Sequence, residues 1–309
     1  MTALYIVLGI VLFILIVCFF GGNYLVSFSL DRESKFNLEA KAKREGWQVK
    51  RPDYSKEEAF LKNDTIVEHI ISRDGFKLTA YYADCKKKTN KFVLLIHGYG
   101  GIPEEMVPFA RHYLEKGFNC LIPVMRAHGI SEGRYMGMGA LEKFDMFLWL
   151  DFICKKNPDA EILLHGVSMG GATVMMMSGM NLPPNVKVAV EDCGYTSIHD
   201  IFSNKLKTLF HLPSFPMIQM ASLVSRMRAG YSFSKGNSLK SVSKAKIPMV
   251  FIHGQDDGFI PVEMVDKVYN ACPTDKTKLV VPGANHIKSL STAPVDYWNT
   301  VDNFIKKYI

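Results

Sequence analysis

The sequence lacks internal repeats, low-complexity tracts and long linkers rich in glycine, serine or proline. Nothing in its organisation therefore forces a division into separate modules. Zinc-finger, RNP-like and basic-helix patterns are missing too, so no nucleic-acid partner is expected. The 309 residues are enough for one large α/β domain with a sizeable core, or for two small domains.

Cysteine is scarce, and its pattern does not suggest disulfides. Six cysteines are present, and five of them lie beyond the first twenty residues: Cys85, Cys120, Cys154, Cys193 and Cys272. That number is odd, and most of these residues lie in apolar segments without paired spacing. A secreted disulfide framework uses an even number of cysteines at regular spacings, so the pattern fits a reducing compartment better.

Charged residues are absent from Ala3 to Phe20, and the residues that follow as far as Leu30 are only weakly polar. This stretch is long enough to cross a bilayer as a helix. The alternatives are a cleaved signal peptide and a buried core helix. Because no basic region precedes the stretch and no A-x-A-like site follows it, we expect an uncleaved anchor over residues 1–30.

Basic residues follow this segment and none precedes it; the nearest are Arg32, Lys35, Lys41, Lys43 and Arg44. Under the positive-inside rule, this asymmetry places the rest of the chain in the cytoplasm. The net charge of +7 is modest, and its densest run lies at residues 85–91. We interpret that run as a solvated hairpin tip rather than a patch for lipid headgroups.

Residues 31–62 are rich in charge and helical in tendency, and we interpret them as a connector. Beyond them, strand-like and helix-like segments alternate, which predicts one α/β domain over residues 63–309 with a mostly parallel sheet and helices on both faces. The expected strands are 65–72, 77–83, 92–97, 119–124, 161–165, 186–191, 247–253 and 278–281. The expected helices are 103–116, 141–156, one from 171 onward, 262–271 and 295–308.

One segment interrupts the alternation. Residues 198–244 carry many large apolar side chains and two prolines, and they are too long for an ordinary connection. We interpret them as a helical cap inserted after the sixth core strand. Most of its apolar side chains would serve packing, and some are expected to line a pocket.

The most informative motif is G-V-S-M-G at residues 166–170. A strand-like segment precedes it and a helix-like segment follows it, which is the setting of a nucleophile elbow. The flanking glycines fit this setting because the turn is strained and side chains there would clash with the neighbouring strand and helix. The motif predicts that Ser168 is a nucleophile lifted above the sheet, next to a helix N-terminus that favours negative charge.

A second match to the same pattern, G-I-S-E-G at residues 129–133, is centred on Ser131. It runs into R-Y-M-G-M-G at residues 134–139, which is too rich in glycine to begin a helix. We therefore interpret Ser131 as a loop residue.

A serine hydroxyl needs a base to take its proton, and the base needs a carboxylate to orient it. In elbow enzymes the chain order is serine, acid, histidine. Of the nine histidines, only His286 follows the last predicted strand, downstream of both Ser168 and an acidic loop. That loop holds Asp256 and Asp257, and Asp192 follows the preceding strand. The residues alone do not separate these three acids.

Acyl transfer also needs two N–H donors for the oxyanion. The backbone N–H of Met169, directly after the nucleophile, is the first expected donor. The second is expected from the loop H-G-Y-G-G at residues 97–101, which resembles an H-G-G-G motif, and we assign it to Tyr99. Three histidines at predicted strand ends, His97, His165 and His253, could serve structure or contact substrate.

Taken together, these motifs resemble the α/β-hydrolase superfamily over residues 65–309. Within it, the chain is most similar to membrane-anchored bacterial hydrolases with serine-aminopeptidase-like or bile-acid-acyltransferase-like domains. The resemblance rests on the segments HGYGG, RAHGISEG, GVSMGG, HGQDDGFIP and GANH. In the family pattern H-G-x-x-D-x-x-V-P the acid lies four residues before proline, which implies Asp257, with Ile260 in place of valine. Met125 departs from the aspartate frequent in relatives, at a position without a triad role.

The resemblance implies a serine hydrolase that uses neither a metal nor an organic cofactor. We expect an acyl-enzyme on Ser168 and cleavage of an ester or thioester, because an apolar cap suits a small-molecule or lipid-like acyl substrate. One alternative is a peptidase or aminopeptidase, which would need a carboxylate near the pocket to hold a free amine. Another is a non-catalytic binding protein on a hydrolase fold.

Overall fold

The computed structural model describes residues 1–36 and 51–309. Part of the predicted connector, residues 37–50, lies outside the described residues. The described end of the connector contains helix α3 (Ser55–Asn63), whose first turn holds Glu57 and Glu58 and whose last turn holds Lys62. This charge order suits the helix dipole.

The described residues build an eight-stranded sheet in the order β1-β2-β4-β3-β5-β6-β7-β8. The first two strands pair antiparallel with each other, β2 pairs antiparallel with β4, and the remaining pairs are parallel. The strands are β1 (Ile66–Ile71), β2 (Lys77–Ala83), β3 (Lys91–Ile96), β4 (Asn119–Val124), β5 (Glu161–Val167), β6 (Val186–Asp192), β7 (Met249–Gly254) and β8 (Lys276–Val281). The predicted mostly parallel sheet is therefore confirmed.

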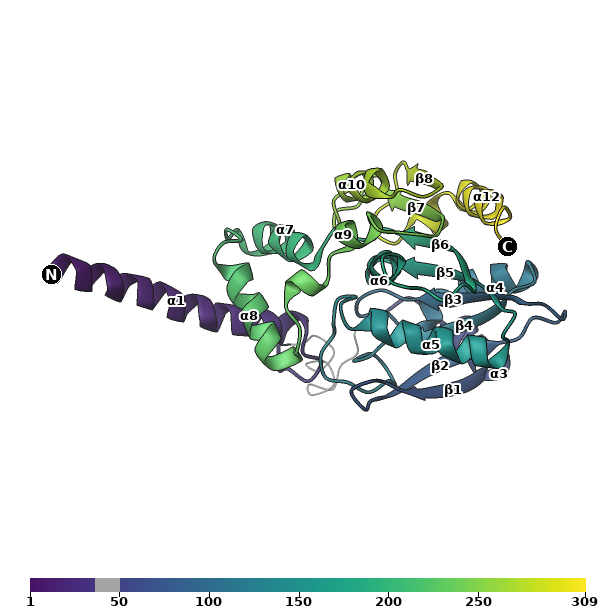
Figure 1. The fold of residues 1–309 in the computed structure, drawn as a ribbon, viewed down its shortest axis with the longest axis horizontal. Helices are drawn as coiled ribbons and strands as arrows, with labels where there is room; N and C mark the ends of the chain where they lie inside the picture. Colours follow the sequence, from purple (N-terminus) through teal and green to yellow (C-terminus); the bar gives the residue numbers. More distant parts are fainter. Residues whose placement is uncertain (37–50) are drawn as a thin grey trace.

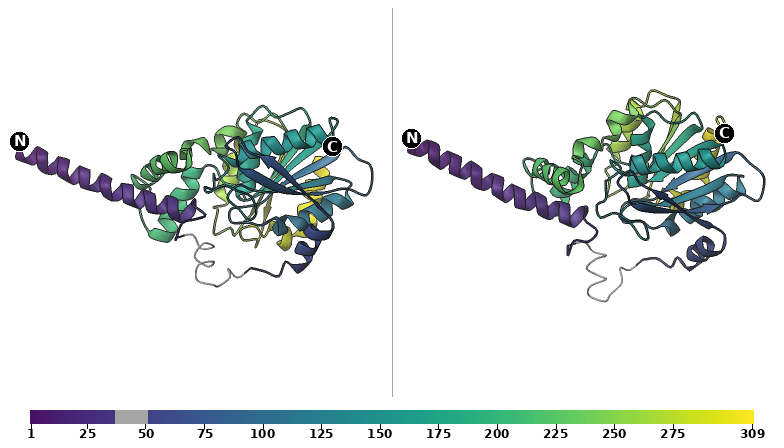
Figure 2. Two further views of the ribbon diagram at one scale, coloured as in Figure 1. Left: turned by 90° about the horizontal axis from the view of Figure 1, so that it is seen from below. Right: turned by 60° about the horizontal axis from the view of Figure 1, so that its bottom comes forward.

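Helices cover both faces of this sheet (Figures 1 and 2). Strand β3 shows why: its side chains alternate between two buried clusters, with Phe92, Leu94 and Ile96 in one and Val93 and Leu95 in the other. The first cluster includes side chains of α5 (Glu142–Lys156), α6 (Met169–Ser178) and α10 (Glu263–Ala271). The second includes side chains of α3, the 3₁₀ turn η1 (Pro103–Met106), α4 (Val107–Glu115) and α12 (Pro294–Ile305).

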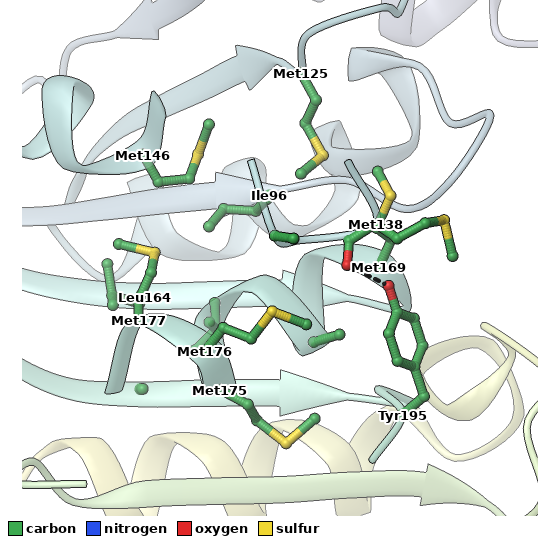
Figure 3. Packing of buried hydrophobic residues seen from close by; sticks show 14 of the residues in the cluster. Ile96, Met125, Met138, Met146, Leu164, Met169, Met175, Met176, Met177 and Tyr195 are labelled. Atoms are coloured by element: carbon green, nitrogen blue, oxygen red, sulfur yellow. Dashed lines mark hydrogen bonds between the residues drawn. The ribbon is translucent and has the colours of Figure 1, made fainter. Parts of the chain in front are cut away.

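Methionines pack around α6, the helix that follows the predicted nucleophile (Figure 3). Met169, Met175, Met176 and Met177 are all buried on this helix. Unbranched thioether side chains fill irregular gaps, which suits a helix wedged between a sheet and a cap. The Tyr195 hydroxyl donates a hydrogen bond of 3.0 Å to the Met138 carbonyl oxygen and so fixes a neighbouring loop against this core.

The cap lies between β6 and β7, after the sixth strand as predicted. It consists of α7 (Ile198–Phe210), α8 (Met217–Ala229), the 3₁₀ turn η2 (Phe233–Lys235) and the short helix α9 (Ser238–Val242). Helix α7 begins at an N-cap, Ser197, whose side chain accepts a hydrogen bond from the Asp200 N–H. Helix α8 ends at Gly230 in the left-handed conformation, which glycine adopts without strain.

Helix α1 (Thr2–Ser29) projects from the body of the molecule on the side of the cap (Figures 1 and 2). It is long and apolar enough to cross a membrane, and its apolar window is almost wholly exposed rather than packed in a core. Its C-terminal end, in contrast, packs on α8. A Cβ atom added to Gly22 would come within 2.8 Å of the Ala221 backbone nitrogen, so the two helix backbones touch there.

Candidate active site

Ser168 lies between β5 and α6 with φ 57° and ψ −115°, a conformation that is costly for a residue with a side chain. The backbone is held there by a hydrogen bond of 2.7 Å from the Ser168 N–H to the Asp192 carbonyl oxygen. The glycines beside it leave no room for side chains: a Cβ on Gly166 would lie 2.2 Å from the Gly170 oxygen, and one on Gly170 would lie 2.0 Å from the Ile96 oxygen. The local structure is the strand-to-helix elbow that the pentapeptide predicts.

The structure brings Ser168, His286 and Asp257 together. The Ser168 Oγ lies 2.9 Å from the His286 Nε2, and the His286 Nδ1 lies 2.8 Å from the Asp257 Oδ2. The other carboxylate oxygen of Asp257 accepts hydrogen bonds of 2.8 Å from the N–H groups of Phe259 and Ile260. Asp257 is thereby fixed and can hold the imidazole with Nε2 facing the serine hydroxyl.

A second histidine, His253, also contacts the carboxylate. Its Nε2 lies 3.3 Å from the Asp257 Oδ2 and 3.0 Å from the Ile260 carbonyl oxygen. Burial by itself would raise the pKa of Asp257, but the hydrogen bonds from His253 and His286 hold that pKa well below its usual range. The carboxylate therefore stays charged at neutral pH, as a group that stabilises an imidazolium must.

The structure separates the three acids that the sequence left open. Asp256 is exposed, and its backbone N–H donates a hydrogen bond to the Ala284 oxygen. Asp192 is buried at the end of β6, and its Oδ1 has no hydrogen-bond partner among the described residues. Only Asp257 is hydrogen-bonded to His286. Ser131 is buried elsewhere, where its hydroxyl donates to the Val124 oxygen at 2.6 Å.

The predicted oxyanion loop lies beside the serine, because a Cβ on Gly98 would come within 3.2 Å of the Ser168 Cβ. Two histidine rings fix this loop. His97 accepts from the Met125 N–H at 3.0 Å through Nε2, and its Nδ1 lies 2.8 Å from the Gly98 oxygen. His128 accepts from the Gly100 N–H at 3.0 Å. Burial lowers the pKa of His97 to about 3, so this ring stays neutral and keeps both hydrogen bonds.

A cavity of about 520 Å³ adjoins Ser168. It lies between α7, α8, the C-terminal end of α1 and the loops that carry Tyr99, Met136 and Phe259, and most of its lining side chains are apolar. Arg51 and Lys205 are its charged members, and none of the described lining residues is acidic. Its volume falls in the range of about 300–1,000 Å³ that is usual for pockets that bury one small ligand.

Within the described parts of the chain, Cys193, Asp257 and His286 form a group whose donor atoms lie within 4.8 Å of one another. Asp257 and His286 already share a hydrogen bond. Burial, next to Asp192 and Asp257, raises the pKa of the Cys193 thiol well above its usual value. Because a metal needs the thiolate, this environment disfavours a metal site, and we assign none here.

Two features of the site were not found by sequence reasoning. The first is the contact of His253 with Asp257, for which the only signal in the sequence was the spacing of four residues between them. The sequence alone did not decide whether His253 serves the structure or contacts the substrate. The participation of α1 in the cavity had no signal, because a helix that is apolar on every side does not reveal which side is packed.

Glu191, at the end of β6, makes folding stability depend on pH. Burial raises its pKa to about 8, and burial raises the pKa of the adjacent Asp192 to about 6. Unfolded carboxyls titrate near about 4, so between pH 4 and 8 the unfolded chain releases protons that the folded chain keeps, and stability falls as pH rises. We expect Glu191→Gln, which can still accept from the Gly194 N–H, to remove part of this loss.

The measurement is Tm of the full chain in detergent at pH 5 and pH 8. Glu191→Gln should raise Tm at pH 8 more than at pH 5, by about 2–4 °C for each kcal/mol recovered. The low pKa of Asp257 acts on stability only below pH 4 and does not contribute to the difference. The same change in Tm at both pH values would contradict a neutral buried Glu191.

Comparisons with known proteins agree with this fold. A family model for the alpha/beta hydrolase fold matches residues 91–219. YqkD of Bacillus subtilis (strain 168) is 25% identical over 249 residues, which cover 80% of this chain and 81% of that protein. The monoglyceride lipase of Saccharomyces cerevisiae is 26% identical over 291 residues, covering 76% and 90%. The structure of the Pyrococcus furiosus esterase Pf2001 aligns with a TM-score of 0.66 and 24% identity, covering 84% of this chain and 97% of that one.

The fold and the site thus define an α/β hydrolase. The chain has the α/β-hydrolase fold, and its similarity in sequence to a monoglyceride lipase supports a hydrolase activity.

Proposed function

We propose that this chain is a serine hydrolase that cleaves a carboxylic ester or thioester through an acyl-enzyme on Ser168. The observation that carries the proposal is the continuous hydrogen-bonded path from the Ser168 Oγ through His286 to Asp257, with distances of 2.9 and 2.8 Å. A buried charged carboxylate, an oriented imidazole and a strained serine are what nucleophilic acyl transfer requires.

The reaction runs in two halves. His286 takes the proton of Ser168 as the oxygen attacks the carbonyl carbon, and the backbone N–H groups of Met169 and Tyr99 bind the oxyanion. His286 then protonates the leaving alcohol or thiol, and the acyl group remains on Ser168. Water, deprotonated by His286, attacks the acyl-enzyme, and collapse releases the acid and returns the proton to the Ser168 oxygen.

The lining of the cavity favours an ester over a peptide. An aminopeptidase needs a carboxylate to bind the substrate's free amine, whereas the charged side chains among the described lining residues are the cations Arg51 and Lys205. The apolar remainder suits an acyl group. We also propose that the chain is most similar to serine-aminopeptidase-like and bile-acid-acyltransferase-like hydrolases. Of the two activities, cleavage of an acyl ester is preferred over cleavage of a peptide.

We also infer that α1 is a single-pass anchor and that the hydrolase domain faces the cytoplasm. The exposed apolar surface of α1 supports the anchor, since such a surface is costly in water. The basic residues that follow the helix support the orientation.

The test is covalent labelling of the full chain in detergent with a fluorophosphonate probe, followed by peptide mapping. We expect the label on Ser168 alone, and a simple ester in excess should protect against it. Folded protein that takes no label, or takes it at another serine, would refute the acyl-enzyme and return the non-catalytic binding protein to consideration.

A further inference from the structure

The C-terminal end of α1 is part of the wall of the cavity that holds Ser168. Leu25, Phe28 and Ser29 line this cavity together with side chains of α7 and α8. Leu25 and Phe28 are three residues apart and so lie on one face of the helix. The segment expected only to attach the enzyme to a membrane therefore reaches the site itself.

This end of α1 is held firmly. The Ser29 carbonyl oxygen accepts a hydrogen bond of 2.7 Å from the hydroxyl of Tyr99, the residue assigned to the oxyanion loop. Arg228 of α8 donates to the Ser27 Oγ at 2.7 Å and to the Asp31 Oδ2 at 2.8 Å. Asp31 is buried and also pairs with Arg134 at 2.8 Å. A buried carboxylate between two guanidinium groups fixes the helix end relative to the cap and the loops of the domain.

The cavity also opens to the surface of the molecule next to α1. The rings of Phe28 and Phe210 face each other edge-on with centroids 6.4 Å apart, and both residues line the cavity while remaining more than a third exposed. Leu209, also in the lining, is 64% exposed. Phe28 lies near the C-terminal end of α1, and Leu209 and Phe210 lie at the C-terminal end of α7. Figure 1 shows α7 and α8 on the side of the molecule from which α1 projects. Apolar cavity wall and apolar helix surface are therefore continuous.

We propose that the substrate is a single-chain acyl ester that enters from the lipid layer along α1 and rests its acyl chain against Leu25 and Phe28. This inference rests on the proposed serine hydrolase function. The continuous apolar surface favours lipid as the source, because an acyl chain that moves along it never crosses water. A volume of about 520 Å³ suits one chain rather than two.

Leu25→Trp tests the proposal because the larger side chain would occupy part of the cavity. The matched control is Leu12→Trp, the same change on the same helix at a side chain that is 60% exposed and outside the lining. We expect Leu25→Trp to lower kcat/KM for the 4-nitrophenyl esters of dodecanoic and hexadecanoic acid at least about tenfold, since small shape changes in an apolar pocket change selectivity by about 10–200-fold. Turnover of the acetate ester should fall by a smaller factor than turnover of the two long esters, and Leu12→Trp should alter neither.

An equal loss for short and long esters, or no loss for either, would overturn the proposal. The acetate ester also separates the two hypotheses, because wild-type protein that hydrolyses no ester fails the proposed function itself.

A second readout does not depend on turnover. Full-length protein in phosphatidylcholine vesicles is irradiated with a hexadecanoic acid that carries a terminal diazirine. Cross-links within residues 24–31 are expected in wild type and reduced in Leu25→Trp; cross-links that leave this segment unlabelled would overturn the proposal.

Discussion

Ser168→Ala is expected to lower kcat for 4-nitrophenyl acetate by about a millionfold, the loss that removal of the serine causes in triad hydrolases. The change removes the single atom that forms the acyl bond, so no other side chain in the triad compensates. Alanine fits the site because the elbow already holds a Cβ there. The measurement is the initial rate with full-length protein in detergent, with Tm recorded beside it to show that the fold is retained.

Ser131→Ala is the matched control, since Ser131 occupies the centre of the other G-x-S-x-G sequence. Its hydroxyl donates a hydrogen bond to the Val124 oxygen and accepts one of 2.9 Å from the Thr79 N–H. Removing it leaves buried groups unpaired, at a cost of about 1–3 kcal/mol in stability. The rate should be unchanged. If Ser131→Ala abolished turnover while Ser168→Ala kept it, the nucleophile assignment would be wrong.

Local sequence patterns were enough to predict the elbow and the sheet. The strained turn at Ser168 requires glycines on both sides, and those glycines are visible in the sequence. The strands carry continuous apolar runs because parallel strands are covered on both faces, as the full burial of β4 and β7 shows. The position of the cap followed from chain length, since no ordinary connection needs that many residues.

The choice among acids depended on information that no local pattern contains. Asp256 and Asp257 are neighbours in the loop after β7, and the path of that loop decides which one meets His286. The hydrogen bonds from the Phe259 and Ile260 N–H groups to Asp257 turn its carboxylate inward. The family resemblance indicated Asp257 in advance, whereas the residues themselves were silent.

The role of α1 could not be predicted for a different physical reason. The packed face of an amphipathic helix can be predicted because the opposite face is polar, but α1 is apolar on all sides. The relevant signals are small: Gly22, which allows close approach to α8, and Asp31, a charge that is buried only because two arginines from distant segments surround it. The sequence does not indicate which residues pack against Gly22 or pair with Asp31.

Asp257→Asn is expected to lower kcat/KM by about ten-thousandfold while leaving Ser168 and His286 in place. The carboxylate accepts from the His286 Nδ1–H and holds the tautomer whose Nε2 can take the serine proton. An asparagine amide that donates to Nδ1 would instead favour the tautomer with the proton on Nε2, where it cannot act as a base. The same change deprives His253 of its charged partner. The measurement is kcat/KM for a short ester between pH 6 and 9.

Asp256→Asn is the control at the adjacent position. Its side chain is exposed, and the hydrogen bond that holds its backbone to Ala284 does not involve the carboxylate, so kcat/KM should stay within about twofold of wild type. Asp192→Asn completes the series, because Asp192 is the third acid near the site and burial raises its pKa to about 6. A ten-thousandfold loss in Asp192→Asn, with activity retained in Asp257→Asn, would move the acid of the triad from the loop after β7 to the end of β6.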